Sequence, residues 1–448
     1  MSAATTAHEL AALLGSGGVL SPAPREYLTE ASGPAVGRAD AVVLPETAEQ
    51  VAAAVRWCYD HDVPMVPRGG GTGYAGGTHA DGGVVIALDR MTRVRQFDPL
   101  LWRIHVEAGL RTGDLRRIVR ESGLFFPPDP GAAEQSQIGG NVATNAGGPH
   151  AFKYGVTGRW VTGLEAVIAP GEVVQIGGAS RKDVAGYDMK SLLIGSEGSL
   201  GIITAAWLRL IPAPEAAHPV VAFYPTARAG CDAIETVFGS GIEAAALEYL
   251  DEGAFAIARG AYPGSSPERG FMVIADADGT EQEAVRVRDE LVEVLGDGAL
   301  AVEAPAAAEL WRWRDGVSLA VMARRGAKLA EDVAVPLDRL ADAVQLTVDI
   351  GARHGLEAVS WGHAGDGNLH SNFLYDADGD GHARADAAAR ELLTAVVALG
   401  GTISGEHGIG TMKQPYLAGQ LSPPLLGAMH AVKRALDPKG LFNPGKAI

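Results

Sequence analysis

The chain has 448 residues, with 37 Lys and Arg against 54 Asp and Glu, so its formal net charge is −17. Such an acidic chain lacks the basic face typical of nucleic-acid-binding proteins, and we expect no nucleic-acid partner. Its two cysteines, Cys58 and Cys231, exclude a disulfide framework and iron–sulfur ligation and fit a reducing compartment. Glycine, at 59 residues, occurs at roughly twice its usual share.

No targeting or membrane-spanning segment is expected. The residues up to Gly18 contain no basic segment followed by an apolar one, as a signal peptide would require. No stretch of the sequence is apolar over the ~18 residues that suggest a membrane-spanning helix. We therefore expect a cytoplasmic protein with no membrane span.

In the first region, up to about Pro212, short predicted strands alternate with two helices and long glycine-rich stretches. Residues 46–61 predict a helix capped by Thr47, and residues 111–122 predict a second helix that ends at Gly123. Strands are predicted at 63–66, 84–88, 104–108, 163–169, 173–176 and 202–210. The strands at 163–169 and 173–176 are expected to form a hairpin.

After residues 212–214 the predicted strands are interleaved with longer helices. Strands are predicted at 220–224, 271–275 and 332–335, with a pair between 358 and 375. Helices are predicted at 281–295, 337–354 and 383–399, with a short one after Gln420. This order, without a βαβ nucleotide signature, favours an antiparallel α+β domain.

The first glycine-rich stretch, Gly69–Gly83, contains a G-x-G-x-x-G pattern from Gly71 to Gly76. A dinucleotide loop of the Rossmann type requires a helix to begin there, but Gly77, Gly82 and Gly83 oppose a helix and the next element is a strand. Backbone amides of such a glycine run can still converge on an anion, with Arg68 adding charge. A set of tight turns is the structural alternative for this stretch taken alone.

Two further glycine clusters follow in a recognisable order: Ile138–Gly148, preceded by Pro127–Gly131, and Ile194–Ile203. With these motifs the chain, from about Asp40 to its C-terminus, resembles the FAD-binding proteins of the vanillyl-alcohol oxidase and p-cresol methylhydroxylase superfamily. Within it, the sequence is similar to the branch that contains D-lactate dehydrogenase, D-2-hydroxyglutarate dehydrogenase and the D-type subunit of glycolate oxidase.

The resemblance implies an α+β fold, in which a two-subdomain FAD-binding domain is joined to an antiparallel α+β substrate domain and a short C-terminal helical segment. The expected divisions are an N-terminal helical segment at 1–35, the FAD-binding domain at 36–212, the substrate domain with a metal site at 213–408, and a C-terminal segment returning to the flavin at 409–448. No His or Cys lies between Pro67 and Gly77, so we expect FAD to be bound non-covalently.

The implied FAD contacts lie in the three glycine clusters and in the C-terminal motif Phe442–Lys446. They are Pro67, Arg68, Gly69, Gly70, Gly71, Thr72, Gly73, Gly76, Gly77, Pro128, Asp129, Gly131, Gly139, Gly140, Asn141, Thr144, Asn145, Gly147, Gly148, Glu197, Gly198, Gly201, Ile203 and Asn443.

The C-terminal half carries two histidines, His363 and His370, on either side of a Gly365–Gly367 turn. Such a turn lets two strand ends bring both imidazoles to one point, and imidazole with carboxylate suits Zn²⁺ or Mn²⁺. From the spacing alone, a structural role for both histidines stays open. The resemblance implies that His363, His370 and Glu406 bind the metal and that His407 is the catalytic base.

An anionic substrate requires cationic partners in so acidic a chain, and arginine offers bidentate geometry to a carboxylate. The resemblance implies that Arg314, Ser318 and Asn372 contact the substrate. Lys328 is a further candidate, although its spacing to Pro336 departs from the family pattern. The alternative for Arg324, Arg325 and Lys328 is a solvated helix face.

The function implied is oxidation of a D-2-hydroxy acid, of the lactate, glycolate or 2-hydroxyglutarate type, to the 2-oxo acid. The metal would assist, His407 would take the hydroxyl proton, and the hydride would pass to flavin N5. The alternatives are a metal-free FAD oxidase of an alcohol or sugar, a subunit of a multi-subunit glycolate oxidase, and a metallohydrolase with a vestigial flavin domain. The individual acid, the electron acceptor and the oligomeric state, for which a homodimer is one arrangement, stay open.

Overall fold

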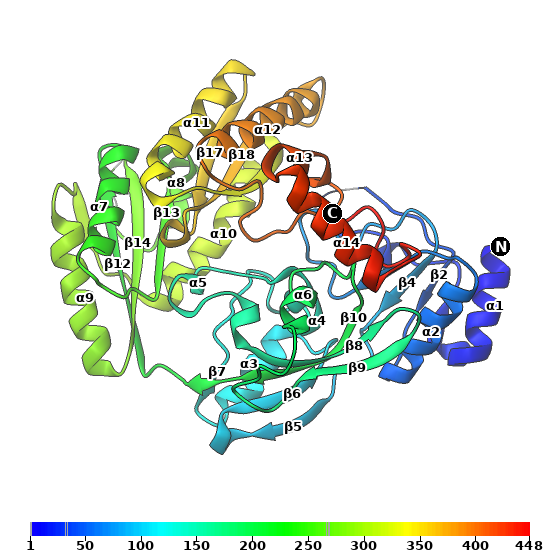
Figure 1. The fold of residues 1–448 in the computed structure, drawn as a ribbon. Helices are drawn as coiled ribbons and strands as arrows, with labels where there is room; N and C mark the ends of the chain where they lie inside the picture. The colour runs from blue at the N-terminus through cyan, green and yellow to red at the C-terminus, as the bar shows by residue number, and fades with distance from the viewer. Residues whose placement is uncertain (1, 32, 34, 266, 268) are drawn as a thin grey trace. The chain divides into compact units, whose positions relative to one another are not determined.

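The computed structural model describes residues 2–31, 33, 35–265, 267 and 269–448, and Figure 1 traces the chain. The chain divides into two compact units. The first consists of Met1–Gly147, Val156–Pro212 and Glu406–Ile448, and the second consists of Gly148–Gly155 and Ala213–Gly405. The first unit is therefore built from three separate stretches, the last of which returns from the second unit.

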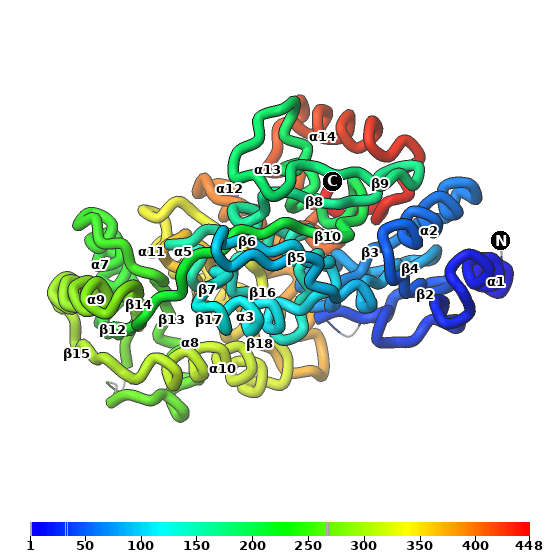
Figure 2. The backbone as a smooth tube through the Cα atoms, turned by 90° about the horizontal axis from the view of Figure 1, so that it is seen from below, coloured from blue at the N-terminus to red at the C-terminus, as the bar shows by residue number. Residues whose placement is uncertain are grey.

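The first unit begins with a four-stranded sheet in the order β1-β2-β4-β3, in which β1 is antiparallel to β2 and the other pairs are parallel. Its strands are β1 (Val19–Leu20), β2 (Ala41–Val43), β3 (Met65–Arg68) and β4 (Val84–Ala87). Helices α1 (Ala3–Leu14) and α2 (Ala48–Asp60) lie side by side in Figures 1 and 2 and bury Leu10 and Val51 in one core with this sheet. Thr47 caps α2 as predicted, by accepting a hydrogen bond from the Gln50 amide.

A five-stranded antiparallel sheet in the order β5-β6-β10-β8-β9 forms the other half of the first unit. Its strands are β5 (Val94–Asp98), β6 (Arg103–Glu107), β8 (Val161–Ile168), β9 (Glu172–Gly177) and β10 (Ile202–Arg209), and a separate pair joins β7 (Leu124–Phe125) to β11 (Ile211–Pro212). The hairpin predicted around residues 170–171 is confirmed by β8 and β9. The remaining helices of the unit are α3 (Thr112–Arg120), α4 (Ile138–Thr144), α6 (Met189–Leu193), α13 (Leu417–Gln420) and α14 (Pro423–Leu436).

Helix α4 was not predicted, because glycine disfavours helix interiors. The reason it forms is tertiary: a Cβ on Gly139 would stand 2.6 Å from the Cβ of Ala108, so only glycine lets the helix approach the end of β6 so closely. Packing at this point therefore overrides local propensity.

The second unit contains one seven-stranded sheet in the order β15-β12-β14-β13-β17-β18-β16, and all its pairings are antiparallel. The predicted antiparallel α+β domain is thus confirmed. Its strands are β12 (Ala216–Tyr224), β13 (Ala246–Leu250), β14 (Phe271–Gly279), β15 (Ala301–Glu303), β16 (Gly326–Ala334), β17 (Glu357–Gly362) and β18 (Asn368–Asp376). Its helices are α5 (Ala151–Tyr154), α7 (Ala227–Gly239), α8 (Glu252–Ala258), α9 (Glu281–Gly296), α10 (Ala307–Arg325), α11 (Leu340–Arg353) and α12 (Gly381–Ala398).

The two faces of this sheet are covered by different helices. Helices α8 and α10 pack on one face, where Phe255 and Trp313 share a core with Val359 and Trp361 of β17. Helices α7, α9, α11 and α12 contact one another and the sheet, and the Thr347 hydroxyl of α11 bonds to that of Ser371 on β18 at 2.8 Å. Residues that alternate along one strand therefore face either the α8–α10 layer or the α11 layer.

Several elements of the second unit differ from the prediction. Helices α5, α7, α8 and α10 and strands β13 and β15 were not predicted, and β16 begins at Gly326, well before the predicted strand at 332–335. Lys328 therefore lies on a strand, so the solvated-helix alternative was wrong for this residue. That alternative holds for Arg324 and Arg325, which are exposed in the last turn of α10.

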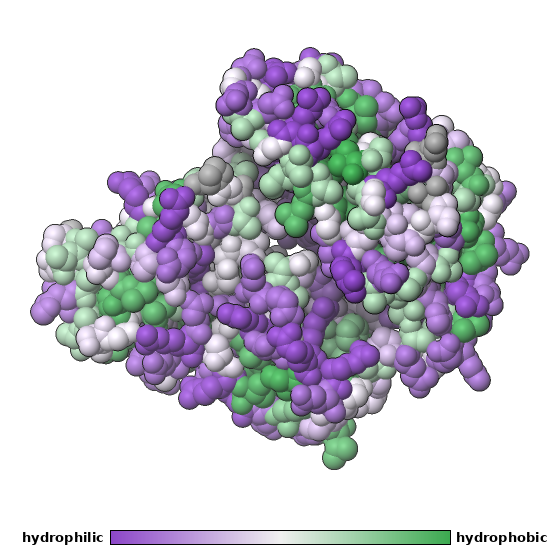
Figure 3. All heavy atoms as spheres, turned by 180° about the vertical axis from the view of Figure 1, so that it is seen from behind, coloured by the Kyte–Doolittle hydropathy of each residue, from purple (hydrophilic) through white to green (hydrophobic). Residues whose placement is uncertain are grey.

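The face of the molecule drawn in Figure 3 is covered mainly by hydrophilic residues, with hydrophobic ones in small separate groups. Among the described residues, no helix combines the length and the apolar character that a membrane crossing requires.

Candidate functional site

The loop after β3 is a cradle of backbone amides in the first unit. No helix begins in it, and the next regular element is β4, so the prediction that it is not a Rossmann loop is confirmed. The amides from Gly71 to Ala75 have no hydrogen-bond acceptor among the described residues. The amides of Gly76 and Thr78 donate to the carboxylate of Glu30 at 2.5 and 2.9 Å. Consecutive free amides of this kind bind anions.

The glycine clusters that lie far apart in the sequence meet around this loop because they lack side chains. A Cβ on Gly70 would overlap the carbonyl of Gln135, just before α4. A Cβ on Gly198 would overlap Pro67, and one on Gly410 would overlap the Ala75 carbonyl. The three glycine clusters and the glycines after Glu406 therefore form one backbone surface. If the first stretch were only a set of tight turns, this convergence of distant glycines would have no explanation.

Glu197 and Asn443 tie the C-terminal stretch to this surface. The Glu197 carboxylate accepts the amides of Ile409 and Gly410, each at 2.7 Å. The Asn443 side chain donates to the carbonyls of Gly77 at 2.9 Å and Glu197 at 2.6 Å. Burial raises the pKa of the Glu197 carboxyl above its ordinary value, while the two amide hydrogen bonds act in the opposite direction. Glu197 thus has a structural task in addition to the FAD contact predicted for it.

The residues present fit an extended dinucleotide. Besides the free amides of the loop, Oδ1 of Asn443 and Oε1 of Gln137 are buried without a hydrogen-bond partner. Buried polar atoms rarely lack a hydrogen-bond partner, so a ligand or a water molecule is expected to bind to both oxygens. Arg68, expected to add charge to the anion site, instead holds the loop, because its guanidinium donates to the Glu26 carbonyl at 2.7 Å and the Thr78 hydroxyl at 3.1 Å.

The other predicted FAD contacts lie around α4. The Arg116 guanidinium fixes the Pro128 carbonyl at 2.8 Å in the stretch that leads to Asp129 and Gly131. Thr144 bonds back to the Gly140 carbonyl at 3.0 Å, and Asn141 bonds to Thr112 at 2.6 Å. Gly201 and Ile203 stand at the start of β10, Asn145 ends α4 in the left-handed conformation, and Gly148 begins the segment that belongs to the second unit.

His407, the predicted base, lies beside the amide cradle. Its ring centroid is 4.9 Å from that of Tyr74, which belongs to the loop between Gly73 and Gly76. Its Nε2 is 3.9 Å from Oε1 of Glu406, a predicted metal ligand. A Cβ on Gly147 would stand 2.7 Å from Oε2 of Glu406, so this glycine lets the carboxylate lie against the second cluster.

In the second unit, the predicted polar residues gather on the sheet face that α10 covers. The register pairs His370 of β18 with Asp332 of β16 and with Trp361 of β17, and it pairs Asn372 with Ala330 and Val359. Because side chains alternate along a strand, His370 and Asn372 share this face, as predicted.

Glu248, on the unpredicted strand β13, organises one side of this face. It is fully buried, and its two oxygens accept hydrogen bonds from Nδ1 of His363 at 2.5 Å and from Arg314 at 2.6 Å. Burial alone would raise the pKa of Glu248, but the charges of His363 and Arg314 hold it below its ordinary value. A carboxylate that accepts the Nδ1 proton of a histidine leaves Nε2 as the metal-binding nitrogen.

Asp332 is the second carboxylate that the sequence did not single out. It is fully buried, and its Oδ1 lies 3.9 Å from Nδ1 of His370. It accepts hydrogen bonds from Asn368 at 2.6 Å, from the Ser404 hydroxyl at 3.2 Å and from the Gly405 amide at 2.9 Å.

The two histidines themselves meet across the turn. The rings of His363 and His370 are perpendicular, with centroids 5.2 Å apart. Their ring nitrogens suit Zn²⁺ or Mn²⁺, whereas the Glu248 and Asp332 carboxylates beside them are engaged in hydrogen bonds. The two histidines of the second unit therefore fit part of the ligand set of a divalent metal, and Glu406 and His407, the other predicted residues, belong to the first unit.

The remaining predicted substrate residues are partly brought together. Lys328 donates to the Ser318 hydroxyl at 2.8 Å and lies 4.8 Å from the centre of the Trp361 ring. Burial lowers the pKa of Lys328 to about 8. Oδ1 of Asn372 and Nε of Arg314 are buried without a hydrogen-bond partner. The Asn372 oxygen, as an acceptor, and the Arg314 Nε, as a donor, are thus available to a ligand on the sheet face that α10 covers.

Comparison with known proteins matches almost the whole chain. The family described as FAD linked oxidases, C-terminal domain, matches residues 213–447, and the FAD binding domain family matches residues 39–177. Glycolate oxidase subunit GlcD of Bacillus subtilis (strain 168) is 36% identical over 415 residues, covering 91% of this chain and 88% of that protein. D-lactate dehydrogenase of Anaerostipes hadrus is 33% identical over 428 residues, covering 91% and 89%.

Among solved structures, p-cresol methylhydroxylase with substrate bound superposes with a TM-score of 0.82 at 20% identity, covering 99% of this chain and 96% of that one. This likeness concerns the fold alone and agrees with the predicted α+β architecture. Both the family matches and the curated relatives lead to one assignment: the chain belongs to the FAD-linked oxidases and is an FAD-linked oxidoreductase.

Proposed function

We propose that this protein oxidises a D-2-hydroxy acid to the 2-oxo acid, with non-covalently bound FAD and a divalent metal ion. The observation that carries the proposal is the pairing of two facing histidines with Glu248 and Asp332 on one buried sheet face. The names of the relatives support the substrate class, since they are a glycolate oxidase subunit and a D-lactate dehydrogenase.

His363, His370 and Glu406 would hold the metal, which would act as a Lewis acid on the substrate hydroxyl. Glu248 fixes the ring of His363 by accepting its Nδ1 proton at 2.5 Å. Asp332 lies 3.9 Å from His370 and is itself held by Asn368 and Gly405. These buried carboxylates keep both rings in place and raise their basicity as ligands.

The substrate carboxylate would be recognised by the cationic side chains of the same face. One terminal nitrogen of Arg314 donates a hydrogen bond to Glu248. Its buried Nε has no hydrogen-bond partner and is available to a second acceptor. Lys328, oriented by Ser318, supplies a second cation, and Asn372 presents a free amide oxygen to a hydroxyl.

His407 would remove the proton of the C2 hydroxyl, which an imidazole can accept near neutral pH. Bound FAD supplies the acceptor for the two electrons that leave C2 with its hydrogen. Removal of the hydroxyl proton and of this hydride converts the alcohol into the 2-oxo group. The contact between the rings of His407 and Tyr74 supports this role, because Tyr74 belongs to the amide loop to which FAD is assigned.

The test is anaerobic bleaching of the flavin absorbance in the FAD-loaded protein by matched D- and L-2-hydroxy acids. We expect bleaching by a D-acid of the lactate, glycolate or 2-hydroxyglutarate class and little by its L-enantiomer. Bleaching by simple alcohols or sugars alone, in protein without bound metal, would favour the metal-free oxidase instead.

Similarity to the glycolate oxidase subunits of Bacillus subtilis and Escherichia coli supports a second arrangement, in which the chain works as one subunit of a complex. The purified chain distinguishes the two cases. If it bleaches with the acid but passes no electrons to soluble acceptors, it requires a partner to complete turnover.

Removal of the metal is expected to abolish flavin reduction while FAD stays bound, because FAD is assigned to the amide cradle and the metal to the histidines. The measurement is the bleaching rate after chelation, with the metal content determined by elemental analysis. Addition of Zn²⁺ or Mn²⁺ should restore the rate, and addition of Mg²⁺ is the matched control because imidazole ligands suit it poorly. Full activity in protein verified to be metal-free would remove the metal from the proposal.

Lys328 is expected to impose an alkaline limit on kcat/KM. Because burial lowers its pKa to about 8, the ammonium loses its proton as the pH rises through that value, and attraction for the anionic substrate is lost. In Lys328→Arg the side chain stays charged, so the decline near this pH should disappear. Lys328→Met should have a raised KM below this pH and should likewise show no decline near it. A decline that persists unchanged in Lys328→Arg would assign it to another group.

A further inference from the structure

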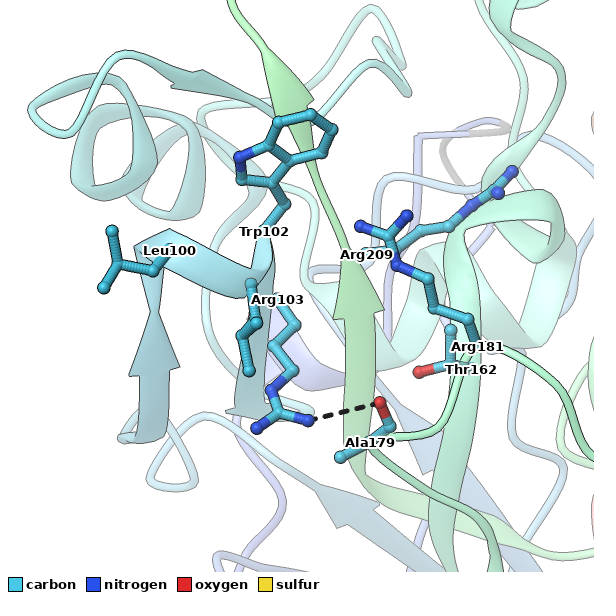
Figure 4. A pocket seen from close by; sticks show the side chains of 8 residues that line it. Leu100, Trp102, Arg103, Thr162, Ala179, Arg181 and Arg209 are labelled. Carbon is cyan, nitrogen blue, oxygen red and sulfur yellow. Dashed lines mark hydrogen bonds between the residues drawn. The ribbon is translucent and has the colours of Figure 1, made fainter.

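A pocket with a volume of about 390 Å³ lies on the five-stranded sheet of the first unit, away from the residues discussed so far. Figure 4 shows its lining, which comes from the turn before β6, from the end of β10 and from the segment after β9. The lining residues are Leu100, Leu101, Trp102, Arg103, Thr162, Ala179, Arg181 and Arg209. Three of the eight are arginines and none is acidic, in a chain whose net charge is −17.

Each arginine of the pocket lies near an indole ring, and Arg103 also forms an ion pair with Asp98 at 3.4 Å. The guanidinium carbon of Arg209 lies 4.6 Å from the centre of Trp160, that of Arg181 lies 5.7 Å from Trp102, and that of Arg103 lies 5.8 Å from Trp207. Stacking on an aromatic face positions a guanidinium and leaves its edge free for hydrogen bonds.

The hydrogen-bonding capacity of these arginines is largely unused. Arg103 makes two long contacts, at 3.4 Å to the Ala179 carbonyl and at 3.4 Å to Asp98. Nε of Arg103 and Nε of Arg209 are buried and have no hydrogen-bond partner. Among the described residues the guanidinium groups of Arg181 and Arg209 have no hydrogen-bond acceptor, so their outer nitrogens are available to an anion in the pocket.

Repulsion among the arginines near the pocket also favours a bound anion. Burial, and then the nearby charges of Arg159 and Arg181, lower the pKa of Arg209 below its ordinary value. Like charges held together in this way destabilise the folded chain unless an anion neutralises them. The cluster is therefore better explained by a ligand than by stability.

We propose that the pocket formed by Arg103, Arg181 and Arg209 binds the phosphate group of a small organic molecule or lipid head group. Three guanidinium groups match the several oxygens and the charge of a phosphate, to which arginine binds in bidentate fashion. The volume falls in the range of small-molecule sites. Leu100 is 90% exposed and Trp102 is 38% exposed at the rim, which gives the phosphate's organic part an apolar contact.

The pocket is separate from the FAD cradle. Strand β10 begins at Ile202, next to Gly201 of the third glycine cluster, and ends at Arg209 of the pocket. At about 3.3 Å per residue, the two ends of this strand are roughly 20 Å apart. An anion bound here is therefore not the pyrophosphate of FAD.

The test uses the FAD-loaded protein, so that the amide cradle is already filled, at low ionic strength. Inorganic pyrophosphate should bind by calorimetry and raise the unfolding temperature. Arg181→Gln combined with Arg209→Gln should weaken binding by about tenfold or more. Without pyrophosphate, the unfolding temperature of the double variant should be no lower than that of Arg181→Gln alone. Both variants should keep the parent's rate of flavin reduction.

The matched control is Arg56→Gln, which removes a half-exposed arginine of the same unit that pairs with Glu172. A second arm measures sedimentation with vesicles of phosphatidylcholine, with and without phosphatidylglycerol. Arginine-dependent binding to pyrophosphate identifies a free phosphate ligand, and arginine-dependent binding only to vesicles with phosphatidylglycerol identifies a lipid head group. Equal binding by the parent and the double variant, or no binding in either arm, would overturn the proposal.

Discussion

Replacing His407 by asparagine is expected to leave FAD bound and to slow flavin reduction by about 10²–10⁴-fold, the range that a general base contributes. Asparagine keeps a polar side chain next to Tyr74 but cannot accept the hydroxyl proton. The two effects should separate, because the close contacts described for the glycine surface involve Pro67, Ala75 and Gln135 and not the His407 ring. The measurement is the rate of anaerobic bleaching by the best acid, with FAD content determined from the flavin absorbance.

Tyr74→Phe is the matched control for this prediction. It removes only the hydroxyl and keeps the ring that lies 4.9 Å from His407, so the bleaching rate should stay close to that of the parent. A His407→Asn protein that is reduced at the parent rate would assign the proton to another group. A variant that loses FAD would instead show that His407 supports the cradle, which its absorbance spectrum would reveal directly.

The sequence predicted the parts of the structure that local patterns determine. Thr47 caps α2, the hairpin of β8 and β9 forms where Pro170 and Gly171 predicted it, and His363 and His370 meet across their turn. Each of these depends on residues at most 14 positions apart. The glycine clusters were also informative over long range, because a position that admits no side chain indicates close contact with something else.

The features that were missed depend on pairings between distant residues. Strand β13 is buried along its whole length, so it shows no alternation of polar and apolar residues, which makes a short strand hard to recognise. Its single charged residue, Glu248, was the available signal, because a charge within an apolar run requires a partner. Asp332 stood at the start of a predicted strand, but only the register of β16 against β18 reveals its contact with His370.

Replacing Glu248 by glutamine is expected to lower the free energy of unfolding by about 3–5 kcal/mol, the usual cost of removing one partner from a buried ion pair. Glutamine keeps the shape of the side chain but leaves the Arg314 guanidinium, only 7% exposed, without its counter-charge. It also removes the carboxylate that accepts the Nδ1 proton of His363. Metal binding should therefore weaken together with stability.

The measurement is urea unfolding followed by tryptophan fluorescence, which reports this region because Trp313 and Trp361 lie in its core. The matched control is Glu357→Gln, whose carboxylate pairs with Arg325 at 3.2 Å near the surface and should contribute less than about 1 kcal/mol. The double variant Glu248→Gln, Arg314→Met should be less destabilised than the sum of its single changes, because no charge is left buried alone. A loss no larger than that of Glu357→Gln would mean that Arg314 finds another acceptor, and strictly additive losses would mean that the pair is not coupled.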